Sequence, residues 1–329
     1  MRTIFFRNRP TITATSSIAG PKECSGGIGK FIQTKLSDDM YGEKTFEKAE
    51  SRMLFTSIKN SIINAGKNES DVDAIISGDL LDQIIASTFS ARNFDTGYLG
   101  VYNACATFAE ALTLGATLID GNYMNNVVCA ASSHFSSAER QYRFPLELGC
   151  TRPPQSQWTV TGAGSCVLAS DGKGPKITAA TIGKIVDYGI TDANNMGAAM
   201  APAALNTLLT LFNDTKTNPE DYDLIVSGDL GTLGSRVLKD LIWEKGFDIE
   251  KQHVDCGELV YNIAEQEYQG GSGAGCSALV FSSYLFDKLK KGKLKKIIIM
   301  ATGALLSSLS SQQGESIPGI AHAVVVEGE

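Results

Sequence analysis

The hydrophobic and polar positions of this chain follow two different periods. Apolar residues recur every three to four positions over residues 38–66 and again over residues 197–213, which predicts two amphipathic helices. Short apolar runs predict strands at 126–131, 159–169, 175–186, 296–302 and 321–327. Strands that alternate with helices, and that are apolar on both faces, indicate an α/β layered architecture.

Two pairs of segments resemble one another within the chain. DVDAIISGDL (71–80) and DYDLIVSGDL (221–230) are identical at seven of ten positions. Residues 105–132 align without gaps with residues 276–303, and in both segments a cysteine in a small-residue turn opens a helix that a strand follows. Two such pairs in the same order along the chain predict an internal duplication.

The two helices that the cysteines open are rich in Ala, Leu, Thr or other apolar residues on nearly every face, which is typical of a helix buried all round. We therefore divide the chain into an N-terminal half, 1–172, and a C-terminal half, 173–329. We expect the halves to pack into one five-layer α-β-α-β-α unit with these two helices in its middle layer.

Composition and charge exclude several classes of function. The chain has 329 residues and a formal net charge of −7, and its densest basic run, Lys288–Lys296, is typical of a helix C-terminus and turn, so we expect no nucleic-acid partner. Its seven cysteines lack the spacing of a zinc site, which favours reduced thiols over disulfides. We expect no signal peptide and no membrane-spanning segment, because no apolar stretch has the required length.

Ten stretches, spread over most of the chain, carry a more specific resemblance. They are AGPKE (19–23), SGDLL (77–81), NACAT (103–107), ASSHFSSAERQYRFP (131–145), TVTGAG (159–164), GITDANNMGAAMAPAA (189–204), YDLIVSGDL (222–230), DCG (255–257), GGSGAGCSA (270–278) and ATGALLS (301–307). With the duplicated halves, they resemble the thiolase superfamily, which includes the ketoacyl synthases, and more closely the stage V sporulation protein AD family of spore-forming bacteria.

The resemblance implies a function in the spore. A protein of this family is expected to lie peripheral to the inner spore membrane, to work with membrane proteins of the same complex and to form a homodimer. It is expected to bind dipicolinic acid, with or without calcium, for movement across that membrane, in the pocket where relatives carry out thioester chemistry. No cofactor is implied.

The resemblance also places Cys105 at the nucleophile position of the superfamily. A condensing enzyme needs a helix N-terminus to activate the thiol, imidazole or amide partners, and an oxyanion hole. Cys256 and Gly271 stand where relatives carry these polar partners. We therefore predict a vestigial nucleophile, no catalytic residues, and a cavity with room for a small ring.

A planar dicarboxylate suits such a cavity if two helix N-termini, at Cys105 and near Gly275, point into it. Cationic or hydroxyl partners are also needed to bury its charges. The predicted ligand-binding residues are Lys22, Cys105, Ser132, Ser133, His134, Arg140, Cys256, Gly271 and Ser272, with Arg143 as a further candidate. His134 is equally typical of a structural hydrogen bond. Asp79 and Asp229 could offer oxygens to calcium, but their position after a strand is more typical of a helix cap.

Three hypotheses about function remain open at this point. The first is a non-catalytic binding protein for dipicolinic acid or its calcium chelate. The second is an acyltransferase or condensing enzyme that uses Cys105 as an acyl-accepting nucleophile. The third is a scaffold for membrane partners whose pocket is vestigial.

Overall fold

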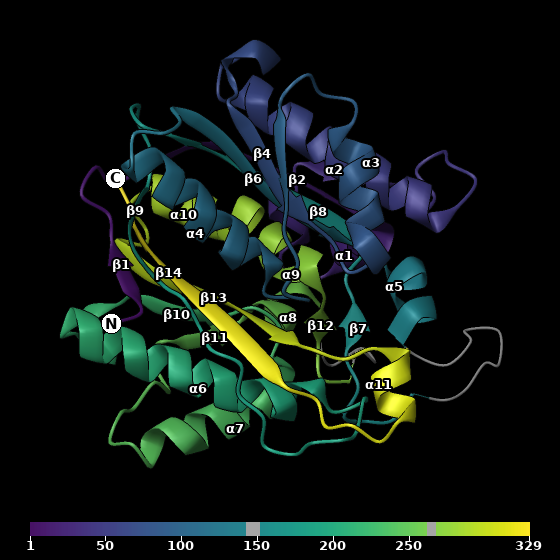
Figure 1. Cartoon of the computed structure of the whole chain (residues 1–329), viewed down its shortest axis with the longest axis vertical. Helices are drawn as coiled ribbons and strands as arrows, with labels where there is room; N and C mark the ends of the chain where they lie inside the picture. Colours follow the sequence, from purple (N-terminus) through teal and green to yellow (C-terminus); the bar gives the residue numbers. More distant parts are fainter. Residues whose placement is uncertain (143–151, 262–267) are drawn as a thin grey trace.

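The computed structural model describes residues 1–142, 152–261 and 268–329. Arg143, one of the candidate ligand cations, lies outside the described residues. Within the described residues, the principal strands follow one path through a mixed sheet, as Figure 1 shows. In path order they are β11 (His253–Asp255), β10 (Leu224–Ser227), β13 (Lys296–Ala304), β14 (Gly319–Glu327), β9 (Lys176–Thr181), β2 (Thr11–Ala19), β8 (Gly162–Ala169), β6 (Asn126–Ser133), β4 (Ala74–Gly78) and β5 (Gly97–Gly100).

The same strand order occurs twice along this path. The first set runs β5-β4-β6-β8-β2 and the second runs β11-β10-β13-β14-β9, and the sets meet where Thr11 pairs with Lys176. Asp73 accepts hydrogen bonds from the backbone N–H groups of the two residues at the start of β6, and Asp223 does the same at the start of β13. The internal resemblance therefore extends from sequence to topology and to individual contacts.

Two short strands lie outside this path. The strand β1 (Thr3–Phe5) pairs antiparallel with β9, so the N-terminus of the chain joins the sheet of the second half. The strand β3 (Thr34–Lys35) pairs with β2. A separate two-stranded sheet joins β7 (Trp158–Thr159) of the first half to β12 (Gly271–Ser272) of the second, and this small sheet borders the site described below.

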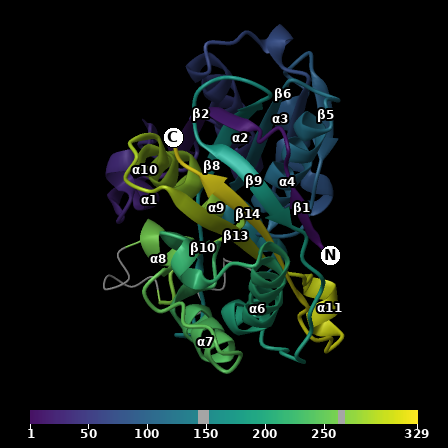
Figure 2. The same ribbon diagram turned by 90° about the vertical axis from the view of Figure 1, so that its left-hand side faces the viewer.

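Helices cover both faces of each strand set, as Figure 2 shows. The outer helices of the first half are α2 (Phe46–Asn64) and α3 (Ile85–Ala91), and those of the second are α6 (Met196–Thr215) and α7 (Gly231–Trp243). The middle layer holds α4 (Thr107–Asp120) and α9 (Ala274–Val280), which continues through a π-helical turn, Phe281–Leu285, into α10 (Phe286–Lys290). The predicted five-layer α-β-α-β-α architecture is confirmed.

The remaining short helices lie around the ends of these layers. They are α1 (Pro21–Ser25), α5 (Phe135–Tyr142), α8 (Cys256–Val260) and α11 (Ser308–Gln312).

The structure corrects three local expectations. The helix predicted from residue 38 begins only at Phe46, because Thr45 accepts a hydrogen bond from the Lys48 N–H and caps it. The strand predicted to reach residue 186 ends at Thr181. Cys276 lies inside the first turn of α9 rather than before it, so it is not the structural counterpart of Cys105.

Close packing between the middle layer and the sheets depends on small residues. Phe108 of α4 and Phe281 are both fully buried, with ring centroids 5.7 Å apart. At Gly164 of β8 the backbone of α9 approaches so closely that an added Cβ would lie 2.1 Å from the carbonyl oxygen of Ala278. A side chain at this position would force the backbone of α9 to move away, so glycine is required there.

We predict that Gly164→Ala lowers the free energy of unfolding by about 3 kcal/mol, since the new methyl group meets backbone rather than a mobile side chain. Gly121→Ala is the matched control, because Gly121 has a helical φ of −75° and the ring of Tyr123 that a Cβ would meet is exposed. Its effect should stay within about 0.5 kcal/mol. Urea titrations of both variants measure the difference, and equal midpoints would contradict the packing argument.

Candidate functional site

A narrow cavity of about 30 Å³ lies at the N-terminal end of α4. It is lined by Leu80, Ala104, Cys105, Ala138, Glu139, Thr159, Met196, Ser272, Ala304 and Leu306. This volume holds about one or two water molecules, whereas pockets for small-molecule ligands typically measure roughly 300–1,000 Å³. The room for a ring that we expected from the sequence is therefore absent from the cavity itself.

The backbone before α4 presents the cysteine to this cavity. Ala104 has a φ of 49°, in the left-handed region that favours glycine. The Thr107 hydroxyl holds this turn, because it donates to the carbonyl oxygen of Ala104 and accepts from the N–H of Asn103. Cys105 follows this turn and is 9% exposed. The candidate nucleophile thus directly follows a strained residue, Ala104, at the entry to a buried helix.

A carboxylate lies beside Cys105. The thiol lowers the pKa of this carboxyl, Asp229, which accepts hydrogen bonds from the Thr302 hydroxyl at 2.7 Å and from the Gly273 N–H at 3.1 Å. Burial raises the pKa of Asp229 to about 6, and these hydrogen bonds oppose the rise. A negative charge beside a thiol opposes formation of a thiolate, in contrast to a neighbouring imidazolium.

The helix N-termini that we expected to bind the ligand are satisfied from within the protein. The Gly273 and Gly275 N–H groups at the start of α9 bind Asp229 and Ser133. At the start of α4, the N–H groups of Ala106 and Thr107 bind carbonyl oxygens of the preceding turn. These donors cannot also bind a ligand carboxylate without breaking those contacts.

The two aspartates of the repeated SGD segments, Asp79 and Asp229, have different hydrogen-bond partners. Asp79 accepts from the N–H groups of Leu81 and Ser87, so it caps α3 as expected. Asp229 does not cap α7, and that expectation was wrong. Asp255 takes the role instead, because it accepts from the N–H groups at the start of α7, Leu230 and Gly231. Asp229 is thereby free to turn toward α9 and Cys105.

Asp255 also anchors a buried serine and histidine. The Ser227 hydroxyl donates to the Asp255 carboxylate at 2.6 Å and contacts Nε2 of His253 at 2.9 Å. Because the hydroxyl proton is used toward the carboxylate, the imidazole Nε2 donates to Ser227 and cannot act as its base. Burial lowers the pKa of His253 to about 3 and raises that of Asp255 to about 7. The three side chains form a buried hydrogen-bonded cluster with a structural role.

The two positions of the missing catalytic partners are filled. Cys256 opens α8 and is fully buried, and burial followed by the charges of Asp255 and Asp229 raises the pKa of its thiol. A Cβ added at Gly271 would lie 3.0 Å from Val160 and 3.3 Å from Tyr261. These two side chains occupy the space that we expected glycine to leave open.

The predicted serines are structural, except for Ser272. Ser132 donates to the buried Glu50 at 3.0 Å, and Ser133 donates to the Val160 carbonyl oxygen at 2.6 Å. Neither lines the cavity, whereas Ser272 of β12 does. Of the predicted ligand residues, the structure brings Cys105 and Ser272 together at the cavity.

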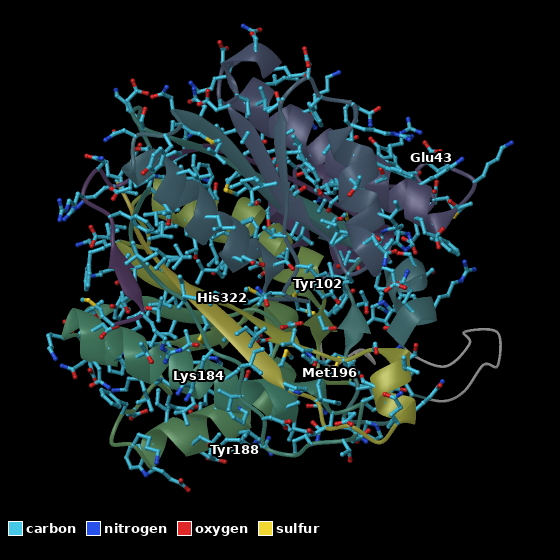
Figure 3. The ribbon with its side chains drawn as sticks, viewed as in Figure 1. Glu43, Tyr102, Lys184, Tyr188, Met196 and His322 are labelled. Carbon is cyan, nitrogen blue, oxygen red and sulfur yellow. The ribbon has the colours of Figure 1, made fainter. Side chains whose placement is uncertain are left out.

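None of the three histidines lines the cavity. The Nε2 atom of His134 contacts the Asp39 carbonyl oxygen at 2.9 Å and Nδ1 accepts from the Ser136 N–H, so both nitrogens of this buried ring are used. His322 lies on β14, as Figure 3 shows, and its Nδ1 accepts from the Gly183 N–H. Since His253 bonds to the buried Ser227, all three histidines form hydrogen bonds within the protein, and a structural role is favoured over ligand binding for each.

The predicted arginine points elsewhere. Arg140 of α5 lies 4.0 Å from the carboxylate of Glu47 and over the ring of Phe46, both at the start of α2. It is half-exposed and does not line the cavity.

A cluster that we did not predict borders the cavity, and we call Lys22, Arg152, Trp158 and Phe135 the cation–aromatic cluster. The Trp158 ring stacks on Phe135 with centroids 3.9 Å apart. The Lys22 ammonium lies 4.3 Å from the Trp158 centroid, and the Arg152 guanidinium lies 5.1 Å from it. Arg152 also pairs at 3.2 Å with Glu139, which lines the cavity. The cluster therefore places two cations beside the site.

Sequence reasoning identified Lys22 but missed the residues that surround it. Trp158 is one of only two tryptophans in the chain and directly precedes the TVTGAG stretch, which was a usable signal. Arg152 lies in a proline-rich loop with no motif, and only the fold brings it to Trp158.

A buried carboxyl ties the AGPKE stretch to both halves. Glu23 of α1 is 1% exposed and accepts hydrogen bonds from the Thr161 N–H and the Tyr261 hydroxyl. Burial raises its pKa from 4.5 to about 7, against the effect of these hydrogen bonds. The neighbouring Lys22 thus lies on α1, and the buried carboxyl that fixes this short helix to the protein is titratable.

The fold and the full-length pattern now place the chain in a family. The family model described as "Stage V sporulation protein AD (SpoVAD)" matches residues 1–327. This chain belongs to the SpoVAD family. It is 39% identical over 327 residues to stage V sporulation protein AD of Bacillus subtilis (strain 168), covering 99% of this chain and 96% of that protein.

Solved structures show that the SpoVAD chain has a thiolase-like fold. A 3-oxoacyl-[acyl-carrier-protein] synthase III from Aquifex aeolicus VF5 superposes with a TM-score of 0.59 at 15% identity, over 97% of this chain and 99% of that one. An OleA structure from Xanthomonas campestris superposes with a TM-score of 0.62 at 15% identity, over 98% of each chain. At this identity the likeness concerns the fold alone.

Metal and membrane signals are weak in the described part of this SpoVAD chain. Both carboxylate oxygens of Asp79 and of Asp229 accept hydrogen bonds from the protein. Across the described ranges, no group of three or more His, Cys, Asp and Glu side chains is placed to hold a metal ion. No helix among the described residues is long and apolar enough to cross a membrane.

We predict that Glu23→Gln flattens the pH dependence of stability. A carboxyl whose pKa is raised in the folded state stabilises the protein fully below about pH 4.5, and this contribution is lost as the pH rises through about 7. The unfolding free energy of the wild type should therefore fall relative to Glu23→Gln by about 1–3 kcal/mol between pH 5 and pH 8. Urea titrations at each pH measure it, with the exposed Glu315→Gln as control. Parallel curves for wild type and Glu23→Gln would refute the assignment.

Proposed function

We propose that this chain is a non-catalytic protein of thiolase-like fold that binds dipicolinic acid, alone or as its calcium chelate, for movement across the inner spore membrane in sporulation and germination. Membership of the SpoVAD family supports a role in sporulation. The observation that carries the binding proposal is the pairing of Lys22 and Arg152 over one tryptophan ring at the edge of the Cys105 cavity.

The surroundings of Cys105 support the proposal of a non-catalytic role. The Asp229 carboxylate lies beside its thiol, and none of the three histidines lines its cavity. Thioester chemistry needs a stabilised thiolate and donors directed at an oxyanion, but the helix N–H groups nearby already bind Asp229 and Ser133. A thiol beside a carboxylate is suited to line a pocket rather than to accept an acyl group.

Recognition of the dicarboxylate is assigned to the cation–aromatic cluster. The Lys22 ammonium can form a charge-assisted hydrogen bond with one ligand carboxylate. The Arg152 guanidinium, whose terminal nitrogens donate to Glu139 and to the Gln157 carbonyl oxygen, adds positive charge beside it. Since the cavity of about 30 Å³ is smaller than a ring, the ligand lies beside Trp158, outside the cavity. Calcium would arrive as part of the ligand, and it would lower the charge that the cluster has to neutralise.

Assembly at the membrane is part of the same proposal. The strand β5 ends the sheet path and exposes Leu99, which is 45% accessible, so this edge can pair with a second copy to form a homodimer. The peripheral place at the inner spore membrane and contacts with its membrane proteins are proposed from the family resemblance.

We predict that Lys22→Gln weakens dipicolinate binding about tenfold, because one charge-assisted hydrogen bond is lost. Isothermal titration calorimetry with and without Ca²⁺ measures the affinity, and the exposed Lys251→Gln is the control. Pyridine-2-carboxylate, which has one carboxylate, should bind more weakly than dipicolinate to the wild type. Equal affinities of Lys22→Gln and wild type would remove Lys22 from the site, and no heat with either ligand would remove the proposed function.

We predict that Cys105 forms no thioester when the protein is incubated with acetyl-CoA or a long-chain acyl-CoA. The Asp229 carboxylate opposes the thiolate that such transfer requires. Intact-mass spectrometry of the wild type and of Cys105→Ala reads the outcome. An acyl adduct that is present in the wild type and absent from Cys105→Ala would establish the acyltransferase alternative.

A further inference from the structure

Four lysines of this acidic protein, Lys30, Lys288, Lys290 and Lys291, line two adjoining surface grooves. Lys293 and Lys295 follow Lys291 in the chain, and we call these six lysines the basic face. Lys30 belongs to the short 3₁₀ turn Gly29–Phe31, Lys288 and Lys290 to α10, and the others to the turn after it. That turn folds back on α10 through hydrogen bonds from the N–H groups of Lys293 and Leu294 to the Lys288 carbonyl oxygen. Figure 2 shows α10 and α1 on the same side of the molecule.

Most of these ammonium groups lack an acidic partner. Lys291 pairs with Asp287 at 2.6 Å, whereas Lys30, Lys288 and Lys290 contact aromatic rings and form no ion pair among the described residues. Lys293 and Lys295 are exposed, and they too form no ion pair there. The chain as a whole has a net charge of −7, so this local excess of positive charge opposes the overall balance.

Helix electrostatics accounts for only part of this pattern. Lysines in the last turn of α10 stabilise the negative end of the helix dipole, which explains Lys288 and Lys290. Lys293 and Lys295 follow the helix, and Lys30 comes from a different segment of the first half. The meeting of Lys30 with the lysines of α10 at these grooves is not required by any helix end.

Aromatic side chains lie between the lysines. The rings of Phe31 and Tyr284 meet edge to face at 5.0 Å, and both are half-buried. The Lys288 ammonium lies 5.5 Å from the centroid of the first ring and 5.3 Å from that of the second. Rings of this kind, with an apolar body beside cations, are typical of protein surfaces at the headgroup level of a bilayer.

Two surface grooves of about 490 and 500 Å³ share Lys30 and Phe31 as a common wall. Glu258 contributes to the first groove and Asp287 to the second, so lysines outnumber acids in both linings together. An anionic phospholipid matches this chemistry. Its phosphodiester group offers negative charge to the lysines, and the boundary with its acyl chains offers apolar surface to the rings.

We propose that the basic face docks on a membrane surface rich in anionic phospholipid. A cluster of four to eight cations near such a surface is attracted by its negative potential, and each Lys contributes roughly a fivefold gain in binding. The proposal shares with the proposed function only a peripheral place at a membrane. Its test uses no dipicolinate, so the two can fail separately.

The full chain is mixed with sedimentable vesicles of phosphatidylcholine alone or with about one quarter phosphatidylglycerol, and the bound fraction is measured at about 0.05 M and about 0.5 M NaCl. We expect binding to the anionic vesicles at low salt, and its loss at high salt. Lys290→Glu/Lys293→Glu/Lys295→Glu should weaken it at least about tenfold, and the Gln triple at the same positions should give an intermediate loss.

The matched control is Lys48→Glu/Lys245→Glu/Lys251→Glu, which makes the same change of net charge at exposed lysines of other elements. Thermal unfolding establishes that each variant is folded. Equal losses in both triple variants, or binding to both vesicle types alike, would overturn the proposal. Binding to poly-glutamate without binding to anionic vesicles would also overturn it, in favour of an acidic protein partner.

Discussion

The constraint on which this structure depends is that helix N-termini in the middle layer are buried away from water. A helix leaves its first N–H groups without partners inside the helix, and burying them is costly unless another group binds them. Here Asp229 and Ser133 bind those of α9, and Asp255 does the same for the outer helix α7. Each of these acceptors comes from a strand end on the opposite side of the contact, so the same bonds hold the layers together.

This constraint also decides what the site can do. Donors that already bind protein carboxylates are not available for an oxyanion, and the carboxylate that binds them lies beside Cys105. The fold of the condensing enzymes is kept, but its central cavity measures about 30 Å³ and lacks histidine. Two cationic side chains, Lys22 and Arg152, instead lie beside the cavity at Trp158, and the proposed recognition of an anion rests on them.

The two halves illustrate how duplication and specialisation coexist. Their strand order and the Asp73 and Asp223 contacts are the same, because these features hold each sheet together. At the next turn the halves differ, since Asp79 caps α3 whereas Asp229 faces Cys105. From this central point, the helical run from α9 to α10 leads to the basic face, so one continuous element connects the site with the surface that we propose to meet the membrane.

The sequence alone determined the layered fold, the duplication and the family, because periodicity, repeated segments and short motifs are local properties of the chain. It also indicated the Asp79 cap, which depends on residues only two and eight positions away. Only the tertiary structure decided the partner of Cys105, the filling of the space at Gly271, and the meeting of Arg152 with Trp158 and Lys22. Most of these contacts join segments far apart in the chain, and which side chain fills a given space is set by packing from both halves at once, which no local pattern records.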